Sequence, residues 1–135
     1  MKKFEFLKHT GDVKFRANGQ DIEQMFENVS LAISNLFSRG QKIKSSNKKE
    51  LSVSGKDYES LLYNFIEELI YLFDAENFVV SKSSVKISKF KIKAIVYGDI
   101  SSNYEDLDAI KSPTYAEMYV RNEDGKWGCQ VVVDV

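Results

Sequence analysis

The feature that most restricts the fold of this 135-residue sequence is a helical pattern between Leu61 and Phe73. Its apolar residues recur at three- and four-residue spacing and form a broad face: Leu61, Leu62, Phe65, Ile66, Leu69, Ile70 and Phe73. A face this wide must be covered by other elements. We therefore expect this helix, with Asp57 as its N-cap, to lie at the centre of the core.

A second amphipathic helix is predicted from Asp21 to about Phe37. Asp21 is a favourable N-cap, and Gln24, three residues later, is expected to complete a capping box. Gly40 lies where the helix should end. The apolar stripe is typical of core packing rather than of a cofactor site.

Most of the remaining chain alternates between apolar and polar residues, which is typical of β-strands. The expected strands lie at 4–17 (two strands joined through His9–Asp12), 51–54, 78–100 (two antiparallel strands with a bend near Ser88), 114–121 and 127–135. The 122–125 turn indicates a hairpin. The predicted fold class is α+β: residues 1–135 form a single domain, with two amphipathic helices packed on a largely antiparallel β-sheet.

Two polar segments separate these elements. Gln41–Glu50 is rich in Lys and Ser and is expected to be a solvated loop; the alternative is a patch that faces RNA or a partner protein. Asp99–Asp108 is expected to be an acidic loop; the alternative is that its carboxylates bind Ca²⁺, although the spacing of an EF-hand is absent. With 19 basic and 20 acidic residues, the chain has no broad basic field that would attract nucleic acid to the whole molecule.

The single cysteine excludes an intramolecular disulfide. Cys129 lies in a predicted strand, where it is expected to be a small buried hydrophobic residue in a reducing compartment. We see neither a signal peptide nor an apolar run of membrane-spanning length. A soluble, cytoplasmic protein is therefore expected.

Two short segments carry the candidate chemistry. His9-Thr10-Gly11-Asp12 lies at the junction of two strands, and the sequence closes on Asp134-Val135 at the end of another. The Asp134 side chain and a terminal carboxylate on Val135 would offer four oxygens, and Asp12 two more, as hard cations such as Ca²⁺ and Mg²⁺ require. The alternative is that the terminal Asp is merely exposed.

Enzymatic activity has little support in the sequence. His9 is the only histidine, so any catalytic triad would have to use it. No P-loop or dinucleotide-binding glycine pattern is present, and one Cys with one His is a poor zinc site. The remaining enzymatic alternative is a hydrolase that uses His9 with Asp12.

The segment Phe6–Val13 resembles the opening of the archease family, in which an aromatic residue and Leu precede His-Thr-Ala-Asp-Val. Further segments resemble archeases in the same order along nearly the whole chain: 21–36, 61–74, Gly98-Asp99, 110–115, Trp127 and 133–135. The chain departs from the family pattern at Gly11 for Ala, Lys14 for Gly and Ala116 for His.

The resemblance implies a non-enzymatic activator of the RNA-splicing ligase that joins 3′-phosphate RNA ends, as in tRNA splicing and RNA repair. Archeases promote guanylylation of that ligase and its multiple turnover, and they bind a divalent cation described as Ca²⁺. Carried over, the metal ligands are Asp12, Asp134 and Val135, and the residues of partner contact and activation are His9 and Lys111. RNA would be contacted only indirectly or transiently. The family has also been regarded as chaperone-like modulators of nucleic-acid-processing proteins.

Overall fold

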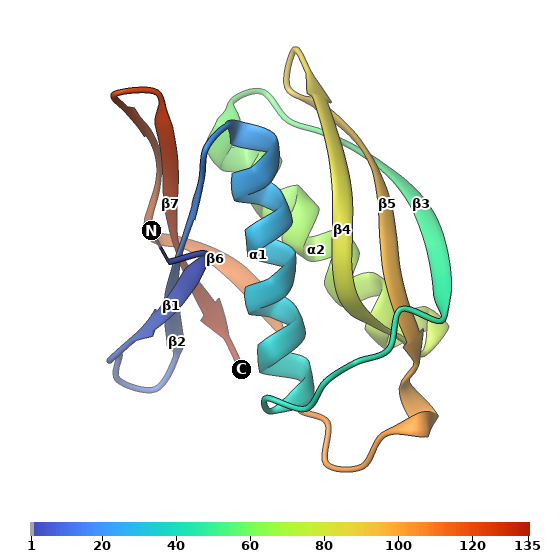
Figure 1. The fold of residues 1–135 in the computed structure, drawn as a ribbon. Helices are drawn as coiled ribbons and strands as arrows, with labels where there is room; N and C mark the ends of the chain where they lie inside the picture. The colour runs from blue at the N-terminus through green and yellow to red at the C-terminus, as the bar shows by residue number, and fades with distance from the viewer. Residues whose placement is uncertain (1) are drawn as a thin grey trace.

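A computed structural model describes residues 2–135, in which two helices lie between two antiparallel sheets (Figure 1). One sheet has the strand order β1-β2-β7-β6 and the other β3-β5-β4. The elements are β1 (Phe4–Leu7), β2 (Val13–Gly19), α1 (Ile22–Ser38), β3 (Asn47–Ser54), α2 (Tyr58–Glu76), β4 (Phe78–Ser88), β5 (Lys91–Ile100), a 3₁₀ turn (Ser101–Asn103), β6 (Ser112–Glu123) and β7 (Lys126–Asp134). The predicted fold class is confirmed.

Both helices begin at the predicted aspartates. The Asp21 carboxylate accepts a hydrogen bond from the Gln24 N–H, and Asp57 accepts one from Ser60. The expected capping box at Asp21 is wrong in one respect: the Gln24 side chain accepts from the Gln20 N–H at 2.7 Å instead. The complete capping box is at α2, where the Ser60 hydroxyl oxygen accepts a hydrogen bond from the Asp57 N–H.

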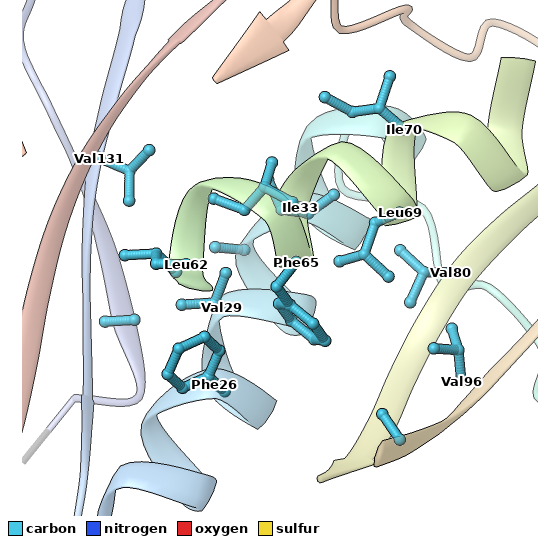
Figure 2. Close-up of a cluster of buried hydrophobic side chains, with 14 of the residues drawn as sticks. Phe26, Val29, Ile33, Leu62, Phe65, Leu69, Ile70, Val80, Val96 and Val131 are labelled. Carbon is cyan, nitrogen blue, oxygen red and sulfur yellow. The ribbon is translucent and has the colours of Figure 1, made fainter. Parts of the chain in front are cut away.

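The core fills the space between the two sheets and is built around both helices, so the predicted central helix α2 shares this place with α1 (Figure 2). Phe65 of α2 meets Phe26 of α1 edge to face, with ring centroids 5.5 Å apart. Val131 approaches the helices from the four-stranded sheet, while Val80 and Val96 approach from the three-stranded sheet (Figure 2). The helices thus hold the two sheets apart and fix their relative placement.

The prediction of a loop at Gln41–Glu50 is wrong for residues 47–50, because β3 begins at Asn47 rather than at Leu51. Its first residues pair with β5, from Asn47 opposite Gly98 onward. The Lys49 ammonium pairs with Glu76 at the end of α2. Cross-strand pairing and this ion pair stabilise extended backbone despite the polar sequence.

The expected regular alternation in the 114–121 strand is also wrong. The register of β6 against β7 shifts between Thr114 and Tyr119, and Glu117 adopts a positive φ of 55°. Such a bulge re-aims the side chains at its centre. It carries Glu117 to a position that no alternating pattern would predict.

Asp99, expected in an acidic loop, instead lies within β5 and is only 4% exposed. Its carboxylate accepts hydrogen bonds from the Tyr104 hydroxyl at 2.8 Å and from the Ile100 N–H at 2.9 Å. These bonds, the tyrosine bond foremost, hold the pKa of Asp99 below its usual value. Asp99 therefore anchors the turn after β5.

No helix within residues 2–135 has the length and apolarity needed to cross a bilayer.

Candidate functional site

The strand register brings the two predicted acidic segments to one edge of the four-stranded sheet. Val13 of β2 pairs with Val133 of β7, so Asp12 and Asp134 each follow directly beyond this pair, at the same end of the two strands. On the other side of β7, Asp134 pairs with Ser112 of β6, and its carbonyl accepts a hydrogen bond from the Lys111 N–H at 2.8 Å. We call Asp12, Asp134 and Val135 the carboxylate edge.

The carboxylates of this edge have no cationic partner within the part of the chain that the structure describes. Neither Asp12 nor Asp134, both half-buried, belongs to any of the ion pairs among residues 2–135. The donor set is all oxygen, which suits a hard divalent cation.

This edge would not supply a metal site from its acidic side chains alone. Across residues 2–135, no group of three or more His, Cys, Asp or Glu side chains is placed to hold a metal ion. Val135, 46% exposed, is the third member of the edge and lines a pocket of about 330 Å³ together with Val13, Asp108 and Ile110. A cation bound there would need main-chain oxygens at Val135 beside the two aspartates.

Lys111 is held next to this edge by its neighbours in the chain. Ile110 and Pro113 are buried on either side, and the Lys111 backbone is fixed by its bond to Asp134. The Lys111 side chain itself is exposed. A positive charge is therefore presented to solvent beside the carboxylate edge, on a backbone that cannot easily move.

His9 joins a different cluster. Its Nε2 lies 3.0 Å from Glu117 Oε2, and Lys14 Nζ donates to Glu117 Oε1 at 3.4 Å. The hydrogen bond with His9, followed by that from Lys14, holds the pKa of Glu117 below its usual value. The hydrogen bond between His9 and Glu117 ties the β1–β2 loop, which carries Asp12, to the bulge of β6.

Glu117 was missed by sequence reasoning, and no sequence signal marks it, because its position depends on the β6 bulge. Lys14, which departs from the family's usual Gly, is one of its two partners. The other nitrogen of His9, Nδ1, is buried and has no hydrogen-bond partner within residues 2–135. His9 thus belongs to the cluster around Glu117 rather than to the carboxylate edge.

Cys129 is buried, as predicted, with 1% of its surface exposed. Burial raises the pKa of its thiol to about 12. At neutral pH the group is therefore a protonated thiol, and the thiolate that nucleophilic catalysis requires is not formed. The geometry assigns Cys129 to packing.

The model of the Archease protein family (MTH1598/TM1083) matches residues 4–135. The chain belongs to the archease family. It is 36% identical to the archease of Pyrococcus abyssi over the full length of both chains, and 34% identical to that of Methanosarcina mazei, with 99% of this chain and 97% of the relative covered.

Two solved structures share the archease fold of this chain. Protein 1598 of Methanobacterium thermoautotrophicum superposes with a TM-score of 0.84 at 31% identity, over all of both chains. An archease of Thermotoga maritima, described as a possible chaperone, superposes with a TM-score of 0.62 at 16% identity, over 96% of this chain and 94% of that one. The second likeness concerns the fold alone.

Proposed function

We propose that this archease-family chain is a non-enzymatic activator of an RNA-splicing ligase, which promotes guanylylation and multiple turnover of that ligase in tRNA splicing or RNA repair. One observation supports the proposal above the others. Asp12, Asp134 and Lys111 are distant in the sequence, yet strand register and one backbone hydrogen bond bring them to the same edge. These are the positions at which the family resemblance implies function.

In this proposal the carboxylate edge holds a divalent cation, Ca²⁺ by the resemblance to the family. Asp12 and Asp134 supply side-chain oxygens, and Val135 supplies main-chain oxygen. A bound cation would offset the repulsion between adjacent carboxylates and order the β1–β2 loop against the end of β7. The cation is thus given a structural part, with no bond-breaking step.

Lys111 is assigned to contact with the ligase or with a guanylate phosphate. Its exposed ammonium suits a phosphate or carboxylate on the partner, while its backbone is fixed beside Asp134. His9 is assigned an indirect part, because its bond to Glu117 holds the loop that carries Asp12.

The second candidate is a chaperone-like modulator of nucleic-acid-processing proteins, in keeping with the description of the Thermotoga relative. General chaperones need a continuous exposed apolar surface. Among residues 2–135, the large exposed hydrophobic residues are spread over different elements of the fold: Phe6, Tyr71, Phe90, Ile100, Tyr115 and Val135. This distribution favours a specific activator.

The proposal predicts that Asp12→Asn abolishes stimulation of multiple-turnover ligation by the host's ligase, while the first turnover of pre-guanylylated ligase is unaffected. The change removes one charge and keeps the shape of the side chain, so folding should be retained. The measurement is the number of ligated products per ligase over time, with and without this protein. Lys111→Ala should also reduce stimulation.

The matched control is Asp124→Asn, which makes the same charge change in the exposed β6–β7 turn. It should stimulate ligation like the unaltered protein. Stimulation that survives Asp12→Asn, or that is lost equally in both variants, would contradict a role for the carboxylate edge.

A further inference from the structure

Positive charge is concentrated on the outer surface of the three-stranded sheet. Ile92 and Val96 of β5 are buried, so the alternate positions of this strand and of its neighbours face solvent. Among the solvent-exposed outward positions, the one acidic residue is Glu50, because Asp99 of β5 is buried and hydrogen-bonded to Tyr104. The exposed lysines at these positions are Lys48, Lys82, Lys86, Lys91 and Lys93. We call these five lysines the lysine face. The formal net charge of the whole chain is only −1, so this segregation of charge is not a consequence of composition.

The charges of the lysine face are not neutralised by the protein itself. None of the five lysines takes part in the ion pairs formed among residues 2–135. Lys86 and Lys93 are direct cross-strand partners, and like charges in that arrangement destabilise a sheet. Glu23, at the margin of the face, already accepts the Ile87 N–H at 2.8 Å. An external polyanion would relieve this repulsion.

The face also offers an aromatic ring and hydroxyl groups among its lysines. Tyr97 of the central strand lies between Lys48 and Lys82 in one row of the sheet, and Lys82 Nζ is 5.5 Å from the ring centroid. Ser52 and Ser84 are exposed nearby and line a hollow of about 370 Å³ that Lys86 and Lys93 also line. Proteins that bind single-stranded nucleic acids combine a positively charged surface with aromatic side chains on which bases stack.

We infer that the lysine face binds single-stranded RNA. The lysines contact successive phosphates, the ring of Tyr97 stacks on a base, and the serine hydroxyls bond a ribose 2′-hydroxyl. An acidic peptide would satisfy the charges but leave the ring and hydroxyls unused. The contact is separate from the carboxylate edge, since it belongs to the other sheet, beyond the helices (Figure 1). It therefore goes beyond the proposed function, in which the ligase holds the RNA.

The test measures binding of the full chain to a labelled oligouridylate by fluorescence anisotropy. The oligonucleotide has about sixteen nucleotides, which is the longest stretch that one small single-strand-binding domain usually covers. Affinity should fall as salt rises, with a log–log slope of about −0.7 for each phosphate neutralised. Lys86→Glu/Lys93→Glu should weaken binding at low salt at least about tenfold. The double reversal exchanges one like-charge pair for another, so the fold should tolerate it.

The matched control is Lys3→Glu/Lys126→Glu, which makes the same change of net charge at exposed lysines on and beside the four-stranded sheet. It should bind RNA within about twofold of the unaltered protein, because its charges lie away from the face. Should the charge reversal unfold the protein, Lys86→Gln/Lys93→Gln serves instead and should reduce the salt slope by about 1.4. Equal weakening in the control, or none in either lysine-face variant, overturns the inference.

Two further arms test the nature of the ligand. Tyr97→Leu should weaken binding about fivefold or more, whereas Tyr97→Phe, which keeps the ring, should not. The corresponding oligothymidylate should bind more weakly than the RNA because it lacks the 2′-hydroxyl. Equal effects of the two Tyr97 variants overturn the stacking assignment, and DNA binding as tight as RNA binding overturns the assignment to RNA.

Discussion

Replacing Phe65 with alanine should lower the free energy of unfolding by about 3–5 kcal/mol. Phe65 is fully buried at the centre of α2, and its ring meets Phe26 of α1 edge to face. Truncation removes the favourable transfer of the ring from water and leaves a cavity between helices that also support both sheets. The measurement is urea unfolding followed by circular dichroism.

The matched control is Tyr71→Ala on the same helix, at a side chain that is 55% exposed. Because most of that side chain is already in water, the expected loss is about 1 kcal/mol or less. Comparable losses from Phe65→Ala and Tyr71→Ala would contradict the burial of Phe65 between the two helices.

Gly98→Ala should destabilise the protein by about 1–3 kcal/mol or more, although it adds only one methyl group. A Cβ at Gly98 would lie 2.1 Å from the Val79 carbonyl oxygen and 2.8 Å from the Phe78 ring. The carbonyl belongs to the paired strand β4 next to its bulge, so the backbone itself must shift. Thermal unfolding should show a clearly lower Tm.

Gly128→Ala is the matched control, since Gly128 also lies within a strand. Its Cβ would meet the Asn18 side-chain oxygen at 3.1 Å, and a side chain can move aside. Alanine is also favoured over glycine in a strand, so we expect a change within about 0.5 kcal/mol. If Gly98→Ala proved as mild as Gly128→Ala, the close approach of β4 to β5 would be incorrect.

The helices and most strands follow from local patterns that the sequence displays. Asp21 and Asp57 mark helix starts because the N–H groups of a first turn need an acceptor, and that need is local. The start of β3 at Asn47 could not be seen, since its lysines are held extended by β5 and by Glu76. The separation into two sheets depends likewise on long-range pairing.

The candidate site, too, could be predicted from the sequence only in part. Asp12, Asp134 and Lys111 could be named from motifs, but their meeting depends on the register of β2, β7 and β6, which residue types alone do not specify. The partner of His9 could not be named at all. Glu117 reaches it only through a bulge with positive φ, and strand alternation places that residue elsewhere.

Calorimetric titration of the purified protein with Ca²⁺ tests cation binding by the carboxylate edge most directly. We predict one saturable Ca²⁺ site, whose occupation raises Tm. Asp12→Asn and a short extension after Val135 should each abolish binding, whereas Asp124→Asn should retain it. Saturation at a hundredfold excess of Ca²⁺ over Kd would add about 2.7 kcal/mol to the free energy of unfolding. Ca²⁺ binding of unchanged affinity in the Asp12→Asn protein, or no binding by the unaltered protein, would contradict cation binding by this edge.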